Sequence, residues 1–226
     1  MGKLRTSNVL IIGDTHMPFE HPNYLEFVKE IQWKCKCKTV IHIGDLVDNH
    51  SISYHEVDPD GDSPKCEMNK ADEHLADWFK AFPELRLTRG NHDCLVDRKG
   101  KTAGLPSRAF KPYRDIWNLP KKWIDDFEFV IDNVLYKHSY GAGMYAHRSG
   151  AVSAGQPVVI GHTHSALGVE YVVTTKDCKF GMNVGCGIDR KKYAFAYGKD
   201  FKFKPILGCG VVTDNGRHAQ VFPMNI

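Results

Sequence analysis

The sequence has no long hydrophobic run, and this lack excludes one large class of protein. A helix that crosses a membrane needs about 20 consecutive apolar residues, whereas the first apolar stretch is only Val9–Ile12. That stretch is also too short for the core of a signal peptide. We therefore expect a protein without a membrane partner that works in the cytoplasm.

A regular cysteine framework and a strong charge of one sign are also lacking. The seven cysteines are an odd number and scattered, which disfavours disulfide bonds and fits a reducing compartment. Cys35 and Cys37 have no second Cys/His pair nearby, so free thiols are favoured over a zinc site. The formal charge of +3 does not by itself imply a nucleic-acid partner. Without repeats or low-complexity tracts, we expect one domain spanning 1–226.

Acidic and histidine residues follow two short apolar runs near the start of the chain. Val9–Ile12 leads into Gly13-Asp14-Thr15-His16, and Val40-Ile41-His42-Ile43 leads into Gly44-Asp45-Leu46-Val47-Asp48. Between them, 22–33 has the apolar spacing of a helix that opens with proline. Strand, helix and strand predict a parallel pair, whose carboxyl ends would bring both acidic clusters to one edge.

A third polar cluster, Gly90-Asn91-His92-Asp93, follows the apolar run 85–87, which a predicted helix over 69–82 precedes. Gly90 allows a sharp turn at the end of that strand. The amide oxygen of Asn91 can bind a metal, and the imidazole of His92 can move a proton. The stretch therefore predicts metal-assisted chemistry at a strand end.

The second half of the chain is mostly strands. The apolar runs predict strands over 127–131, 134–138, 158–160, 169–173, 179–184, 210–213 and 219–222, with a short helix over 147–152. Asp132-Asn133 is typical of a hairpin turn. So many buried strands predict an α/β fold with two sheets packed face to face and helices outside.

The candidate metal ligands along the whole chain are Asp14, His16, Asp45, Asn91, His138, His162 and His164. Histidine, carboxylate and amide ligands without cysteine suit Mn²⁺, Fe or Zn²⁺ and not a structural zinc site. Seven ligands are too many for one ion. Two ions that share a bridging carboxylate would use them all.

The order of these motifs resembles that of the calcineurin-like metallophosphoesterases. The sequence of Asp-x-His, Gly-Asp-x-x-Asp, Gly-Asn-His-Asp, a lone histidine and Gly-His-x-His covers Asp14 to His164, and 183–187 resembles the strand and turn that follow. The resemblance implies a four-layer αββα sandwich of two mixed sheets, the metallo-dependent phosphatase fold. It assigns Asp14, His16 and His164 to one ion, Asn91, His138 and His162 to the other, and Asp45 to both.

The resemblance also suggests a mechanism. Two divalent ions, Mn²⁺ first with Fe, Zn²⁺, Ni²⁺ and Co²⁺ as alternatives, lower the pKa of a bridging water so that hydroxide attacks phosphorus in line. His92 has no ligand role in the family pattern and is the expected general acid. Asp48 is expected to orient His92, and Asp93 to support the loop from behind. His42, His74 and His218 are interpreted as structural.

The substrate is less defined by the residues. Asn49-His50 stands where protein Ser/Thr phosphatases of this family have Arg-Gly, so a phosphate-clamping arginine is missing. The segment 47–53 resembles small stand-alone bacteriophage members, which favours a phosphodiester in nucleic acid or a nucleotide. A phosphomonoesterase, including a protein phosphatase, is the alternative enzyme, and a catalytically inactive metal-binding scaffold is the non-enzyme alternative.

Two segments have more than one interpretation. Basic residues alternate with Phe110, Tyr113 and Trp117 between Lys99 and Lys122. That pattern fits either a groove for a phosphate backbone or, as we favour, a helix with its rings in the core and its lysines in water. The polar stretch 50–66 predicts a loop over the site, and its acidic run 58–62 lacks the spacing of a calcium-binding EF-hand.

Overall fold

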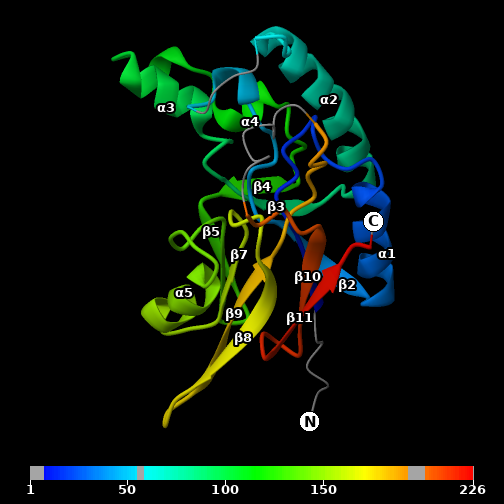
Figure 1. Cartoon of the computed structure of the whole chain (residues 1–226), viewed down its shortest axis with the longest axis vertical. Helices are drawn as coiled ribbons and strands as arrows, with labels where there is room; N and C mark the ends of the chain where they lie inside the picture. The colour runs from blue at the N-terminus through cyan, green and yellow to red at the C-terminus, as the bar shows by residue number, and fades with distance from the viewer. Residues whose placement is uncertain (1–7, 55–58, 193–201, 226) are drawn as a thin grey trace.

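Two mixed β-sheets form the centre of the molecule, shown in Figure 1. The structure is a computed structural model that describes residues 8–54, 59–192 and 202–225. The strands are β1 (Asn8–Ile12), β2 (Cys37–His42), β3 (Leu85–Thr88), β4 (Trp123–Asp126), β5 (Glu128–Ile131), β6 (Val134–Lys137), β7 (Val158–Ile160), β8 (Leu167–Val173), β9 (Cys178–Val184), β10 (Gly208–Thr213) and β11 (His218–Pro223). The helices are α1 (Tyr24–Lys34), α2 (Pro64–Ala81), α3 (Leu95–Thr102), α4 (Tyr113–Ile116) and α5 (Ala146–Ala154), with single 3₁₀ turns η1 (His50–Ile52) and η2 (Ser107–Ala109).

The first sheet has the strand order β11-β10-β1-β2-β3-β4, and the second has β5-β6-β7-β9-β8. In the first sheet β1 to β4 run parallel, while β10 and β11 add antiparallel strands at one side. In the second sheet β6, β7 and β9 run parallel, and β5 and β8 pair antiparallel at the two edges. Both sheets are therefore mixed, as the resemblance implies.

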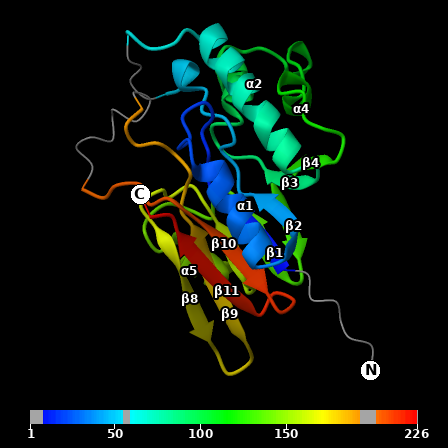
Figure 2. The same cartoon turned by 90° about the vertical axis from the view of Figure 1, so that its right-hand side faces the viewer.

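The central strands of each sheet are buried on both faces, which is why strands such as β1 and β7 are continuously apolar rather than alternating. On β1, Val9 and Ile11 point to the core between the sheets, where they meet side chains such as Tyr136 and Phe180. The neighbours Leu10 and Ile12 point the other way, into the core beneath α1 and α2. Figure 2 looks onto these two helices on the outer face of the first sheet.

On the far side, α5 covers the second sheet. Ala146 and Ala151 of this helix pack against Leu135, Val158 and Ile160. Three separate apolar layers thus lie between four layers of elements, in the order helix, sheet, sheet, helix. The predicted four-layer αββα sandwich is confirmed. Within the described ranges, no helix is long and apolar enough to cross a membrane.

The predicted strands are all present, with bounds that differ by a few residues, and β4 is an additional strand that the sequence did not predict. β4 is short and carries two aspartates, so its hydrophobic pattern is weak, yet it pairs in parallel with β3 and buries Trp123 completely. The hairpin turn at Asp132-Asn133 is as predicted, with φ of 51° and 61° at the two residues.

Two predicted segments are wrong in their extent. The loop over 50–66 ends earlier, because α2 begins at Pro64 with the Ser63 side chain accepting a hydrogen bond from the Cys66 backbone N–H at 3.3 Å. Residues 55–58 of that loop lie outside the described residues. The basic, aromatic segment 99–122 is not one helix, since η2 and α4 are short pieces separated by prolines.

Within this segment the rings do face the core, as the favoured interpretation expected. Tyr113 and Trp117 are buried in the core beneath the first sheet, whereas Lys101, Lys111 and Lys121 are exposed. The face-to-face packing of the two sheets also has a consequence for the site. The carboxyl ends of β1, β2 and β3 in one sheet and of β6 and β7 in the other meet at the same end of the molecule.

Candidate metal centre

The structure brings together the seven residues that the sequence proposes as metal ligands, each from the loop that follows a parallel strand. Asp14, His16, Asp45 and His164 form one cluster, and Asp45, His138 and His162 form a second, with potential ligand atoms within 4.8 Å of one another in each. Asn91 joins the second cluster, with its Oδ1 3.1 Å from Nε2 of His138. Asp45 therefore belongs to both clusters.

One oxygen of Asp45 faces both clusters. Its Oδ2 lies 3.6 Å from Nε2 of His16 and 3.2 Å from Nε2 of His138. Its other oxygen, Oδ1, accepts a hydrogen bond from the backbone N–H of His92 at 2.8 Å. That bond fixes the rotation of the carboxylate, so the free oxygen stays between the two groups of ligands.

The histidines are oriented by hydrogen bonds from their other ring nitrogens. Nδ1 of His138 donates to the backbone oxygen of Ile43 at 3.0 Å, and Nδ1 of His16 donates to Oδ1 of Asp48 at 2.5 Å. In both rings Nε2 is then left unprotonated in the neutral form and points into the cluster. Such partners are what metal-binding histidines ordinarily have.

Two glycines leave the space that the carboxylates occupy. A Cβ atom at Gly90 would lie 2.1 Å from Oδ1 of Asp45, and one at Gly161 would lie 2.2 Å from Oδ1 of Asp14. Both distances are far inside van der Waals contact. The glycines in the Gly-Asn-His-Asp and Gly-His-x-His motifs are therefore required by the close approach of an acid from another strand end.

Three residues of the clusters have the left-handed backbone conformation that L-amino acids disfavour. The φ angles are 52° at His16, 47° at Asp45 and 64° at His162. This conformation costs roughly 1 kcal/mol or more for a residue with a side chain. The strand-end turns thus hold these side chains inward at an energetic cost to the fold.

His92 lies beside the clusters, and its ring is held by Asp48. Its Nδ1 is 2.6 Å from the backbone oxygen of Asp48 and 3.1 Å from that residue's Oδ1. Burial alone would lower the pKa of His92, but the neighbouring carboxylates of Asp45 and Asp48 raise it to about 10. Because Nδ1 donates to Asp48, the proton on Nε2 is the one available to a ligand.

Asp48 contacts two histidines and not His92 alone. Its carboxylate is closer to Nδ1 of His16 than to Nδ1 of His92, and His16, Asp48 and His92 form a third compact group. The loop that carries Asp48 is fixed by α2, where Glu67 accepts the backbone N–H groups of His50 and Ser51 at 2.6 and 2.8 Å. Sequence reasoning missed Glu67, because a glutamate on a polar helix carries no motif.

Asp93 ties two of the site loops together from behind. Its carboxylate accepts hydrogen bonds from the backbone N–H groups of Gly90 at 2.8 Å and Leu46 at 3.1 Å, and from the hydroxyl of Tyr113 at 2.8 Å. Burial and the negative charge of Asp45 raise the pKa of Asp93 to about 6. These contacts match the supporting role that the sequence suggested.

The last histidine motif is anchored in the same way by a buried amide. Asn183, at 0% exposure, donates from Nδ2 to the backbone oxygens of Gly161 at 3.2 Å and Thr163 at 3.4 Å. Its Oδ1 accepts the N–H of Gly185 at 2.9 Å. The stretch 183–187 therefore fixes the turn that presents His162 and His164.

The donor atoms fit divalent cations. Oδ1 of Asp14 is buried without a hydrogen-bond donor among the described residues, although unpaired buried carboxylate oxygens are costly. Ring nitrogens also face each other, with Nε2 of His16 and of His164 3.2 Å apart, and Nε2 of His138 and Nδ1 of His162 also 3.2 Å apart. Ions held among these atoms would satisfy both features, and imidazole with carboxylate suits Mn²⁺, Fe and Zn²⁺ alike.

A cleft of about 820 Å³ opens next to the clusters, and sequence reasoning missed most of its residues. Its lining combines Asn91, His92, His138 and His162 with side chains from outside every motif, among them Tyr54, Arg98, Phe127 and Lys137. The segment 99–122, which the sequence offered as a basic and aromatic groove, does not line it. No local pattern marks the outer residues, because they come from separate loops.

The fold and the donor set together define an α/β protein of two packed sheets with a metal-binding site at the strand ends. A family model for calcineurin-like phosphoesterases matches residues 7–167. The chain belongs to the calcineurin-like phosphoesterase family. The later strands β8 to β11 complete both sheets.

Several solved structures are similar in fold. An archaeal phosphodiesterase is 18% identical with a TM-score of 0.48, covering 96% of this chain and 99% of that one. Vacuolar protein sorting 29 from Cryptosporidium parvum is 12% identical with a TM-score of 0.48 and 97% coverage of both chains. The phosphoesterase YfcE from E. coli is 14% identical, with a TM-score of 0.43 and coverage of 91% and 87%. A search of curated proteins gave no match. Since these TM-scores lie below 0.5, the family assignment rests on the family model.

Proposed function

We propose that this protein is a phosphodiesterase that uses two divalent metal ions. The observation that carries the proposal is the position of Asp45, whose Oδ2 faces both ligand clusters. One ion would be held by Asp14, His16 and His164, and the other by Asn91, His138 and His162, with Asp45 between them. When bound, the pair would supply an activated water and neutralise charge on the phosphoryl oxygens.

His92 would protonate the leaving oxygen. Its ring is buried to 9% exposure, yet it borders the cleft, so Nε2 can reach a bound ester while Nδ1 stays bonded to Asp48. In the metal-free protein the adjacent carboxylates of Asp45 and Asp48 raise the pKa of His92 to about 10, which favours the protonated imidazole. A protonated, fixed imidazole beside the reaction centre is what general acid catalysis of an alkoxide departure requires.

Two features support a diester substrate over a monoester. A monoester dianion carries an extra negative charge, but two of the three Arg and Lys side chains that line the cleft are already engaged: Arg89 bonds Asp125, and Lys137 lies 3.1 Å from Glu128. Asn49, where an arginine clamp would stand, donates its Nδ2 to the backbone oxygen of His92 at 3.1 Å. The cleft, by contrast, gives room for a second ester substituent.

The proposal is tested with two chromogenic esters. Protein stripped of metal and reloaded with Mn²⁺ is assayed on bis-p-nitrophenyl phosphate and on p-nitrophenyl phosphate, with Fe²⁺, Zn²⁺, Ni²⁺ and Co²⁺ in parallel. We expect a higher kcat/KM on the diester and two equivalents of bound metal. A preference for the monoester would make the protein a phosphatase, and silence on both esters with metal bound would make it a scaffold.

A further inference from the structure

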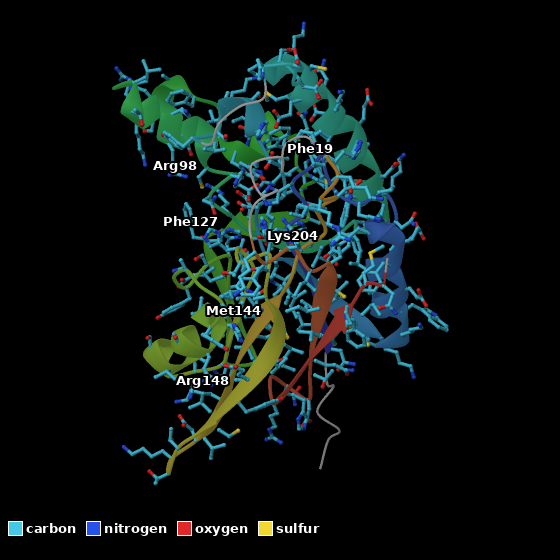
Figure 3. The ribbon with its side chains drawn as sticks, viewed as in Figure 1. Phe19, Arg98, Phe127, Met144, Arg148 and Lys204 are labelled. Carbon is cyan, nitrogen blue, oxygen red and sulfur yellow. The ribbon has the colours of Figure 1, made fainter. Side chains whose placement is uncertain are left out.

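The cleft beside the metal centre has a composition that the proposed chemistry alone does not require. Its outer part is lined by two aromatic side chains, Tyr54 and Phe127, and by the basic Arg98 and Lys137. Figure 3 shows Arg98 on α3 and Phe127 just before β5, on the same flank of the molecule. Both residues help to line the cleft.

Both aromatic rings of the cleft are more than half exposed, although Arg89 lies 5.5 Å from the ring centroid of Phe127. Phe127 is 56% exposed and Tyr54 is 52% exposed, although both are large apolar or amphipathic side chains next to a concave surface. Exposed aromatic rings in a concave site are suited to stacking against a flat ligand. The rings of an unpaired nucleobase have that shape, whereas the bases of a duplex are already stacked on one another.

The charges in the cleft suit an anionic chain. The guanidinium of Arg98 lies 5.0 Å from the ring centroid of Tyr54, and no ion pair joins it to a carboxylate within the described ranges. Lys99 also lies over Tyr54, with Nζ 4.0 Å from the ring centroid. A cation held against an aromatic ring and open to solvent can pair with a phosphate while the ring stacks on the attached base.

The position of His92 relates the cleft to the proposed reaction. The general acid must touch the oxygen that leaves, and His92 lines the cleft together with the candidate metal ligands Asn91, His138 and His162. The outer residues Phe127 and Arg98 line the same cleft. A phosphodiester at the metal centre would therefore have the aromatic and basic residues within the same concave site.

We propose that this cleft binds single-stranded nucleic acid beside the metal centre, with a base stacked on Phe127 and a neighbouring phosphate held by Arg98. The proposal rests on the proposed phosphodiesterase function and names its substrate class. The residues Tyr54, Arg98 and Phe127, which we call the cleft wall, would set specificity, while the metal centre performs the hydrolysis.

Binding to metal-free protein tests the proposal apart from catalysis. The anisotropy of a fluorescein-labelled, single-stranded 12-mer is measured in EDTA with wild type, Phe127→Ala and Arg98→Gln. We expect Phe127→Ala to weaken binding about 5- to 100-fold and Phe127→Trp to restore it. Arg98→Gln should reduce the slope of log Kd against log salt by about one, an effect that a purely structural change would not produce.

Matched controls are offered by exposed residues on other faces. Trp33, 79% exposed on α1, and Arg148, exposed on α5, lie outside the cleft. Trp33→Ala and Arg148→Gln should leave binding unchanged, and a duplex of the same sequence should compete poorly. Equal losses in the control and cleft variants, a loss at Trp33 alone, or equal binding of duplex would overturn the proposal.

The same variants separate this proposal from the proposed function. If wild type hydrolyses bis-p-nitrophenyl phosphate but Phe127→Ala binds the 12-mer as wild type does, the cleft proposal fails and the phosphodiesterase stands. If wild type binds the 12-mer through the cleft wall but hydrolyses no diester, the catalytic proposal fails and the binding site stands. Each result identifies which of the two statements is wrong.

Discussion

The metal centre and the cleft wall lie side by side but are built in opposite ways. The metal centre uses side chains such as Asp14, His16 and Asp45, which are at most 1% exposed and have fixed hydrogen-bond partners. The cleft wall uses Tyr54 and Phe127, which are more than half exposed. Buried, bonded groups have one geometry, whereas exposed ones can adapt. The contrast suggests that catalysis is encoded rigidly and substrate choice is encoded loosely.

The largest loss of activity should follow from replacing Asp45, the residue that both metal ions would share. Asp45→Asn keeps the shape of the side chain but removes its charge, so both ions should be lost or weakened. Because the ions supply several kcal/mol of stabilisation in the transition state, we expect kcat/KM to fall about 10⁴-fold or more. Metal analysis and diester turnover measure it. Retention of two ions would show that Asp45 is not shared.

The next largest loss of activity should come from replacing His92, the proposed general acid. His92→Ala should keep two metal ions and slow turnover roughly 10²- to 10⁴-fold for an alkyl diester, whose leaving group needs a proton. For an aryl ester such as bis-p-nitrophenyl phosphate the loss should be smaller. Steady-state rates on the two esters, with metal content measured on the same samples, provide the check. Equal losses on both would remove His92 from this role.

The third prediction concerns the stability of the loops of the metal centre in protein without metal. Asp93→Ala would leave four buried donors, on Leu46, Val47, Gly90 and Tyr113, without their acceptor. We expect the free energy of unfolding of metal-free protein to fall by about 3 kcal/mol, measured with urea. Tyr113→Phe, which removes one of these donors, should cost only about 1 kcal/mol. A negligible loss for Asp93→Ala would mean that the ions, and not the protein, hold the loops.

A small effect on stability is expected at His74, which lies outside both the metal centre and the cleft wall. His74 is 2.7 Å from Glu20, and its hydrogen bond to that carboxylate raises the pKa of His74 above 6.5. A raised histidine pKa stabilises the fold below pH 6.5, and this contribution is lost as pH rises through the folded-state pKa. With 40% of the side chain exposed, we expect only a few tenths of a kcal/mol. Urea unfolding from pH 6 to 9 should lose this slope in Glu20→Gln.

The smallest effect should be that of the cleft wall on stability. Phe127→Ala and Arg98→Gln remove exposed side chains, so the free energy of unfolding should change by no more than about 0.5 kcal/mol. Thermal melts of the variants used for binding measure it. A loss above 1 kcal/mol would show that the wall is part of the core structure, and the contrast between the two regions would disappear.

The sequence predicted for a physical reason which candidate ligands the fold brings together, while their role as metal ligands stays a prediction. Each proposed ligand directly follows an apolar run, and parallel strands bring their carboxyl ends to one edge, so Asp14, Asp45 and Asn91 had to meet. The cleft wall could not be predicted, because Tyr54 follows η1, Arg98 lies on α3 and Phe127 sits between β4 and β5. Their proximity depends on how separate loops pack, and no spacing along the chain records it.

The fold was predicted in the same uneven way. Strands with both faces buried are continuous apolar runs and were found, whereas β4 was missed because its aspartates interrupt the pattern. The start of α2 was placed too late, although Ser63 and Pro64 are the residues that typically begin a helix. Segment 99–122 was interpreted as a helix because Tyr113 and Trp117 have helical spacing along the chain. In the structure both rings are buried, but α4 is only a short helix.

The left-handed turns at His16, Asp45 and His162 have an evolutionary consequence. Each holds a side chain in a backbone conformation that glycine would adopt without strain. As long as catalysis is under selection, the chain keeps these residues and accepts roughly 1 kcal/mol of strain at each. In a lineage released from that selection, glycine at these positions would relieve the backbone strain but would also remove a side chain that, at His16 and Asp45, is buried and hydrogen-bonded. The same three turns would thus be places where ligands could be lost while the sandwich is kept.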